Sequence, residues 1–511
     1  MTAVPSTLLP MTSGSRIGIV GAGVAGLACA KVLSQAGFPV EVFDRAPDVG
    51  GVWSATRRYP GLRAQNSKFT SPFTDHPMPE DYPRWPDGQQ MQAYLAGYVQ
   101  HFGLGPMLRL GTEVVAADPV DSGWLLEIRD AMGVHRTSCD HLIVANGVFS
   151  DPVMPDLPGA AAFRAAGGHL CHVSEFHDVE QARDRSVVVL GYGKSACDVA
   201  EAVSHLADET SVVARRLTWK MPRTFQGVDY ERLLLTRAGE AHFRSRFPHR
   251  TERLLDRLAL REANLDLLQE RVTRKLRLRE LDLLPSGPIE EIATSSAGLV
   301  TEGFAEQVEA GRITVHRDTE ITELIGGKHG PAVRLADGSL KLAEIVVCAT
   351  GYRQEVPFLT PFVRRALTDE VGDFRLYRHI LPVDVPNLSF AGYNSSNVSA
   401  LSSEIGAHWI AGLLTGEFVP PMPELMNNEI DARLAWSRER GEGNHAHGAS
   451  VVPFSLANID EMLDDLGTPL PLRSRLAQWV RPVRPASYRG VLRDRTPAAA
   501  PAPAPEPVTD R

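Results

Sequence analysis

The feature that most constrains the fold is a strand, glycine-turn and helix unit that occurs twice. Its first copy is "RIGIVGAGVAGLACA", residues 16–30, and its second is "SVVVLGYGKSACDVA", residues 186–200. In each copy an apolar strand leads through glycines into a helix of small residues, an arrangement that binds a dinucleotide pyrophosphate at the helix N-terminus. Strand-like and helical stretches alternate along the rest of the chain, which is typical of α/β proteins. The sequence therefore predicts an α/β protein with two dinucleotide-binding, Rossmann-like domains.

The first turn has the spacing GxGxxG, formed by Gly21, Gly23 and Gly26. The first glycine permits the tight turn, the second lets a pyrophosphate approach the backbone, and the third lets helix and strand pack closely. The next strand ends at Asp44, where a carboxylate can accept both hydroxyls of an adenosine ribose. The alternative is an Asp44 that only caps a helix in a fold without a nucleotide.

A glycine pair follows Asp44 in the segment "APDVGGVW", where Gly50 and Gly51 precede Trp53. A wall free of side chains at this place suits a dinucleotide that continues into a larger ring system, which favours FAD. The segment resembles the FAD fingerprint of flavoproteins with two dinucleotide-binding domains. Two late segments resemble theirs as well: "EIVVCATGY", which contains Gly351, and "NLSFAGYNSS", which precedes an expected helix at 403–414. The resemblance implies a discontinuous FAD domain in which this helix points its N-terminus at the flavin pyrimidine edge.

The second turn reads GxGxxA, with Gly191, Gly193 and Ala196, and Ser195 stands beside the alanine as a further candidate ligand. The strand after it ends in Arg215 and Arg216, where the first copy has Asp44. A carboxylate would repel a 2′-phosphate, whereas two guanidinium groups bind one through charge-assisted hydrogen bonds. The second site is therefore predicted to take NADPH; the alternative is that the two arginines merely begin a solvated loop.

Composition excludes several classes of protein. The 511 residues are 43% hydrophobic and 23% charged with a net charge of -9, so no overall basic field favours nucleic acid. The five cysteines are isolated, so neither a redox dithiol nor a thiolate metal site is expected. No secretory signal and no apolar run of ~20 residues is visible, so we expect a cytoplasmic protein without membrane or metal sites.

The expected organisation is an FAD domain interrupted by an inserted NADPH domain. Leucines and valines at helical spacing among charged residues in 251–284 predict amphipathic helices packed on a domain, rather than helices on a membrane surface. The expected ranges are a flexible arm at 1–14, the first part of the FAD domain at 15–165, the NADPH domain at 166–335 with the helical insertion 251–284, the second part of the FAD domain at 336–490, and a disordered Pro/Ala-rich tail at 491–511.

From residue 15 to 489 the chain resembles the flavin-containing monooxygenases, class B flavoproteins related to the Baeyer–Villiger enzymes. The family signature FxGxxxHxxx(F/Y/W) maps onto Gly168, His172 and Phe176. Its first aromatic position is Ala166 here, and Phe163 stands three residues earlier. The resemblance implies that His172 links the two domains and that it does not react.

The stretch 58–86, "RYPGLRAQNSKFTSPFTDHPMPEDYPRWP", resembles the active-site segment of the same family. The resemblance places an asparagine of this segment over the flavin, which is Asn66 here, with Gln65 as the alternative. "YPGLR" is similar to the Baeyer–Villiger subgroup and assigns Arg63 to its catalytic arginine. The acidic residue that follows that arginine in the subgroup is absent, and Phe176 stands where the subgroup has tryptophan.

The resemblance implies a monooxygenase that uses FAD, NADPH and O2 and transfers one oxygen atom to a small organic substrate through a flavin C4a-hydroperoxide. The missing acidic residue after Arg63 and the phenylalanine at position 176 both depart from the Baeyer–Villiger pattern, which favours N- or S-oxygenation. Baeyer–Villiger oxidation of a ketone is the alternative. A non-catalytic flavoprotein subunit, docked through its Pro-rich tail, is the alternative from another class. A disulfide reductase would need a cysteine pair, and a one-component amine oxidase would lack the second turn. The sequence leaves the substrate and the oligomeric state open.

Overall fold

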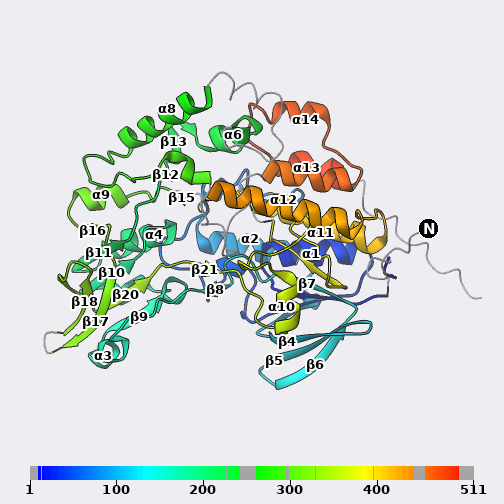
Figure 1. Ribbon diagram of the computed structural model, residues 1–511, viewed down its shortest axis with the longest axis horizontal. Helices are drawn as coiled ribbons and strands as arrows, with labels where there is room; N and C mark the ends of the chain where they lie inside the picture. The colour runs from blue at the N-terminus through cyan, green and yellow to red at the C-terminus, as the bar shows by residue number, and fades with distance from the viewer. Residues whose placement is uncertain are drawn as a thin grey trace, which may run out of the picture.

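Two parallel sheets of five strands each organise the molecule (Figure 1). The computed structural model describes residues 10–12, 14–225, 227–241, 260–293, 298–327, 330–394, 396–441 and 455–493. Within these ranges no helix is both long and apolar enough to cross a membrane.

The first sheet has the order β22-β7-β1-β2-β3, and every neighbouring pair is parallel. Its strands are β1 (Ile17–Val20), β2 (Val40–Asp44), β3 (Leu108–Leu110), β7 (His141–Val144) and β22 (Leu388–Phe390). Helix α1 (Val24–Gln35) packs against α11 (Ser399–Thr415), and α11 in turn packs against α13 (Ser455–Asp465). Because β22 and α11 come from the far end of the chain, the first domain is discontinuous, as predicted.

The second sheet has the order β16-β11-β10-β20-β9 and is also parallel throughout. Its strands are β9 (His169–His172), β10 (Ser186–Leu190), β11 (Glu209–Ala214), β16 (Ile313–Arg317) and β20 (Ile345–Cys348). Helices α4 (Lys194–Val203) and α9 (Phe304–Glu309) pack on it. Strand β20 pairs with β10 and β9 and therefore belongs to the second sheet. The second sheet thus extends beyond residue 335, the predicted end of the NADPH domain.

Smaller sheets and helices surround these two layers. Two antiparallel three-stranded sheets that the sequence analysis did not predict are β4-β5-β6 (Glu113–Val120, Gly123–Asp130, Gly133–Cys139) and β17-β18-β19 (Ile321–Gly327, Gly330–Leu335, Leu340–Leu342). The short strand pairs join β8 (Asp151–Pro152) to β21 (Tyr352–Arg353), β12 (Lys220–Met221) to β15 (Gly298–Leu299), and β13 (Thr224–Phe225) to β14 (Val228–Asp229). The other α-helices in the described ranges are α2 (Gly88–His101), α3 (Ala160–Ala165), α5 (Glu231–Leu234), α6 (Arg237–Ala241), α8 (Leu260–Lys275), α10 (Pro361–Leu367), α12 (Pro423–Gly441), α14 (Leu472–Ala477) and α15 (Arg489–Arg493).

The structure describes only part of three segments for which the sequence made a prediction: the helical insertion, the N-terminal arm and the C-terminal tail. In α8, Leu265 and Val272 are buried in the core of the second sheet, whereas Leu254 and Leu258 lie outside the described residues. The N-terminal arm was expected to be loose, but the Met11 N–H donates to the Leu414 carbonyl at 2.7 Å, which fixes residues 10–12 on α11. Of the expected tail, residues 491–493 belong to α15 and 494–511 lie outside the described residues.

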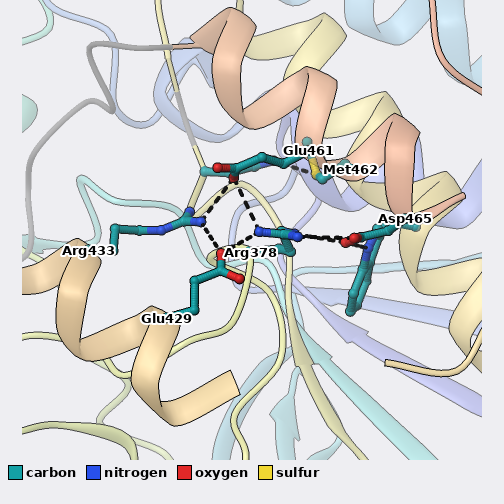
Figure 2. Close-up of polar contacts among 8 residues, drawn as sticks. Arg378, Glu429, Arg433, Glu461, Met462 and Asp465 are labelled. Atoms are coloured by element: carbon teal, nitrogen blue, oxygen red, sulfur yellow. Dashed lines mark hydrogen bonds and ion pairs between the residues drawn. The ribbon is translucent and has the colours of Figure 1, made fainter. Parts of the chain in front are cut away.

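A cluster of partly buried ion pairs around the buried Arg378 attaches α12 and α13 to the first domain (Figure 2). The Arg378 guanidinium donates to both oxygens of Asp465, at 2.8 and 3.0 Å, and also to Glu429. Arg433 of α12 bridges Glu429 and Glu461, each at 2.9 Å. These contacts join α12 and α13 to the loop before β22.

Candidate functional site

The first glycine turn joins β1 to α1, and the fold itself requires two of its glycines. A β-carbon on Gly21, whose φ is +114°, would lie 2.3 Å from the Ala145 carbonyl oxygen. One on Gly26 would lie 1.8 Å from the Gly21 carbonyl oxygen. Gly23 is the N-cap of α1, and no side chain caps this helix. The N–H groups of the first helical turn are therefore available to a phosphate.

Asp44, at the end of β2, faces this turn. One carboxylate oxygen accepts the Ala22 N–H at 2.7 Å, and the other accepts the Ala46 N–H at 2.8 Å. Burial raises the pKa of Asp44, and these two N–H bonds oppose the shift. Each oxygen keeps a lone pair for a further donor, so the group fits the two hydroxyls of an adenosine ribose.

The glycine pair after β2 lies directly on the same turn. The Gly50 N–H donates to the Ala22 carbonyl at 3.0 Å. Gly51 has a φ of +61°, and a β-carbon on it would lie 3.2 Å from the α-carbon of Gly23. Trp53 ends the short 3-10 helix Gly51–Trp53 and is half-buried. Two glycine backbones thus meet without side chains between them, which fits the close approach of a dinucleotide.

The second turn joins β10 to α4 and repeats this geometry. A β-carbon on Gly191, with φ +122°, would lie 2.6 Å from the Ala349 carbonyl oxygen, and Ala196 is fully buried. Gly193 is the uncapped N-cap of α4, and within the described residues no atom lies within 4 Å of its β-carbon position. The turn therefore offers open space at an uncapped helix end. The Ser195 hydroxyl donates to the Tyr59 hydroxyl at 2.9 Å, so this candidate ligand is engaged with the first domain.

Arg215 and Arg216 follow β11 and are both exposed. The Arg216 guanidinium lies 3.5 Å from a Glu291 carboxylate oxygen. Both cations thus stand at the carboxyl end of a strand next to β10, the edge at which parallel sheets bind nucleotides.

Lys220 is a buried cation that the sequence analysis missed. Its Nζ donates to the carbonyl of Tyr192, the residue between Gly191 and Gly193, at 2.7 Å. The same ammonium lies 3.4 Å from the centroid of the Tyr192 ring. Burial lowers the pKa of Lys220 to about 8. The residues around Lys220, "RRLTWK", do not indicate this contact. It arises only because the chain from 215 to 220 folds back toward Tyr192.

Asn66 lies where three parts of the chain meet. Its Nδ2 donates to the Asn397 carbonyl, just before the N-terminus of α11, and its Oδ1 accepts the Tyr230 hydroxyl at 2.5 Å. The neighbouring Gln65 uses its side-chain oxygen to accept the Leu299 N–H at 3.1 Å. Tyr230 was also missed, since nothing in its local sequence marks it as a partner of Asn66.

Arg63 lies three residues before Asn66 and is exposed. Its positive charge contributes to lowering the pKa of Arg223, a shift caused mainly by the burial of Arg223. The Arg223 guanidinium donates to the Ala64 carbonyl at 3.2 Å and lies 4.9 Å from the ring of Trp85. The Arg223 guanidinium therefore contacts the backbone that carries Asn66, and the charge of Arg63 acts on it.

The signature residues lie at one end of the second sheet, where β9 pairs with β20. The His172 Nε2 lies 3.1 Å from the carbonyl oxygen of Gly351, which has a φ of +86° and begins the return to the first sheet. A β-carbon on Gly168 would lie 2.3 Å from the Phe163 ring, so Phe163 packs directly against Gly168. Phe176 is fully buried.

Comparisons with known proteins agree with this geometry. Residues 14–469 match the family model described as "Flavin-binding monooxygenase-like". Human flavin-containing monooxygenase 1 is 27% identical over 437 residues, which cover 82% of this chain and 77% of that protein.

Two solved structures share the fold. The complex of OTEMO with FAD and NADP superposes with a TM-score of 0.68 at 18% identity, covering 88% of this chain and 97% of that one. An S-allyl-L-cysteine S-oxygenase from Allium sativum superposes with a TM-score of 0.61 at 19% identity, covering 95% and 94%. The two glycine turns fit the two dinucleotides FAD and NADPH, and the chain belongs to the flavin-binding monooxygenase-like family of flavin-dependent monooxygenases.

Proposed function

We propose that this protein adds one oxygen atom from O2 to a nitrogen or sulfur atom of a small organic substrate, at the expense of NADPH. The balance is substrate, O2, NADPH and a proton converted to oxygenated substrate, NADP⁺ and water. FAD held at the first glycine turn would supply the redox chemistry between NADPH and O2. The residues of the chain have to bind the two dinucleotides, exclude water and orient the oxygen that is transferred.

The two glycine turns would hold the two dinucleotides. Gly21, Gly23 and Gly26 with the N-terminus of α1 would bind the FAD pyrophosphate, and Asp44 would bind its ribose. Gly50, Gly51 and Trp53 would line the path of the same molecule. The residues that would bind NADPH are Gly191, Gly193, Ser195, Ala196, Arg215 and Arg216, with Gly351 between the two domains.

The observation that carries the choice of reaction is the placement of the Asn66 carboxamide. It is bound from one side by the loop before α11 and from the other by Tyr230. A neutral N–H donor is suited to hold an oxygen that a substrate lone pair attacks, because that reaction needs no anionic oxygen. The structural neighbour that S-oxygenates S-allyl-L-cysteine supports thioethers as one substrate class.

The insertion of oxygen beside a ketone is the second candidate, and the cations near Asn66 favour it. Arg63 and the buried Arg223 form a pair of guanidinium groups, and Arg223 has Glu302 at 3.6 Å as its carboxylate partner. Such a pair would stabilise an anionic oxygen donor, which is the form that attacks a ketone.

A direct comparison of substrates tests the proposal. Purified FAD-loaded protein is given NADPH, air and in turn a thioether, a tertiary amine and a cyclic ketone, and products are identified by mass. We expect a sulfoxide or an N-oxide to form faster than any lactone. A lactone that forms faster than both would favour the second candidate.

A further inference from the structure

Two neighbouring residues of the second domain, Tyr230 and Glu231, hold Asn66 in different ways. The Tyr230 hydroxyl lies 2.5 Å from the Asn66 Oδ1 and 3.0 Å from the Gln65 carbonyl oxygen, and its single proton goes to the nearer acceptor. Just after Asn66, the Glu231 carboxylate accepts the Ser67 N–H at 2.6 Å and the Ser67 hydroxyl at 2.8 Å. Glu231 is 3% exposed, so these are buried, charge-assisted hydrogen bonds. The backbone position of Asn66 is thus set from the second domain.

The partners of Asn66 also fix which way its carboxamide points. The Asn397 carbonyl can only accept, so the amide nitrogen must face it. Burial and the neighbouring Glu231 carboxylate raise the pKa of Tyr230 well above its usual range, which keeps the phenol protonated. The phenol therefore acts as donor to the Asn66 oxygen. With both contacts made, one N–H of the carboxamide remains without a partner among the described residues.

We propose that Tyr230 is a positioning residue for the Asn66 carboxamide, holding its oxygen so that the remaining N–H faces the oxygen-transfer site; this rests on the proposed function of Asn66. Without the Tyr230 hydroxyl, the carboxamide loses one of the two contacts that orient it and keeps only the contact with the Asn397 carbonyl. The Glu231 contacts with Ser67, and with Thr70 at 2.6 Å, would still hold the backbone. The loss would be one of orientation, and reduced oxygen would leave as hydrogen peroxide: NADPH, a proton and O2 give NADP⁺ and H2O2.

The test uses Tyr230→Phe, which removes one hydroxyl and leaves the ring. The matched control is Tyr94→Phe, because the Tyr94 hydroxyl is also buried and donates to the His76 carbonyl at 2.6 Å. Hydrogen peroxide released per NADPH oxidised is measured with a thioether present. We expect Tyr230→Phe to raise this ratio several-fold and Tyr94→Phe to leave it unchanged.

Two measurements that need no turnover accompany the peroxide assay: the visible spectrum of bound oxidised FAD and the backbone hydrogen exchange of residues 62–70.

The FAD spectrum should change in the same way in Tyr230→Phe and Asn66→Ala, and stay unchanged in Tyr94→Phe. Hydrogen exchange of residues 62–70 should remain slow in Tyr230→Phe and become faster in Glu231→Ala, which removes the acceptor of the Ser67 N–H. Faster exchange in Tyr230→Phe would show that the hydroxyl supports the backbone, and would overturn the proposed role.

The double variant Tyr230→Phe/Asn66→Ala separates the two claims. If Tyr230 acts through Asn66, the double variant leaks no more peroxide than Asn66→Ala alone. A leaky Asn66→Ala enzyme beside a fully coupled Tyr230→Phe enzyme would overturn the role of Tyr230 only. A fully coupled Asn66→Ala enzyme would overturn the proposed function of Asn66, and the role of Tyr230 with it.

Discussion

The Lys220 ammonium lies under the second glycine turn, 2.7 Å from the Tyr192 carbonyl oxygen and 3.4 Å from the centroid of the Tyr192 ring. Tyr192 stands between the two glycines that would approach the NADPH pyrophosphate. A buried cation at this point raises the electrostatic potential of the turn without touching the ligand.

We expect the affinity for NADPH to fall as the pH rises through about 8, where burial places the pKa of Lys220. Above this pH the folded protein releases the proton, and the attraction for the pyrophosphate is lost. The dissociation constant of NADPH, measured by titration from pH 7 to 9.5, should rise in the wild type. In Lys220→Met it should be high and nearly constant.

The same group makes a prediction for stability, with the opposite sign. An unfolded lysine has a pKa of about 10.4, so between about 8 and 10.4 the unfolded chain binds more protons than the folded protein. The contribution of Lys220 to the free energy of unfolding therefore increases with pH over this window. Denaturant titrations should show this increase in the wild type relative to Lys220→Met, and equal pH profiles would contradict it.

Each glycine turn can be blocked without a clash inside the protein. A β-carbon on Gly23 would lie 3.6 Å from the α-carbon of Gly51, an ordinary contact, and one on Gly193 would enter open space. Gly23→Ala should therefore fold normally and weaken FAD binding, and Gly193→Ala should weaken NADPH binding while FAD binding stays normal. Thermal melting and titrations with each dinucleotide check this; unchanged affinities would mean that the ligands lie elsewhere.

The arginines after β11 should select NADPH over NADH. Removing Arg215 and Arg216 together should cost about 1.5–3 kcal/mol for each charged hydrogen bond lost to the 2′-phosphate. NADH, which lacks this phosphate, should be affected little. The ratio of kcat/KM for the two coenzymes is the measurement, and equal losses would assign the arginines to the fold.

The part of this site that forms spaced sequence motifs could be predicted, and the part that depends on contacts between distant residues could not. The three glycines, Asp44 and the glycine pair belong to motifs whose residue types recur at a fixed spacing along the chain, so the sequence alone marks them as candidates. Lys220, Tyr230 and Glu231 act through residues distant in sequence, and a single sequence carries no signal for such contacts. Strand β20 was assigned to the wrong side of the boundary at residue 335 for the same reason, because only its pairing with β10 decides its sheet.

The ion cluster of Figure 2 should contribute to stability. Replacing Arg378 with methionine would leave the partly buried Asp465, Glu429 and Glu461 with less compensating charge. Loss of one partner of a fully buried pair costs about 3–5 kcal/mol; these carboxylates are partly exposed, so we expect a smaller cost that still lowers the midpoint of urea unfolding. Replacing the exposed Arg274, which pairs with Glu270 on α8, should change the midpoint little. If replacing Arg378 shifts the midpoint as little as replacing Arg274 does, the Arg378 cluster does not stabilise the fold as predicted.

Asn66 and Arg63 should separate the two candidate reactions. If a heteroatom is oxygenated, Arg63→Ala retains part of the thioether oxidation, while Asn66→Ala releases more hydrogen peroxide and forms less product. Product yield and peroxide are measured together at fixed NADPH. Loss of a dominant lactone-forming activity in Arg63→Ala would instead favour ketone oxidation.

The most direct test of the account is the origin of the oxygen in the product. The FAD-loaded protein is incubated with NADPH, a thioether and O2 enriched in the heavy isotope of oxygen, in ordinary water, and the product is analysed by mass spectrometry. We predict one heavy oxygen atom per product molecule and one NADPH consumed for each. NADPH oxidation that yields only hydrogen peroxide with every substrate class, or a product whose oxygen comes from water, would contradict the assignment as a monooxygenase of this kind.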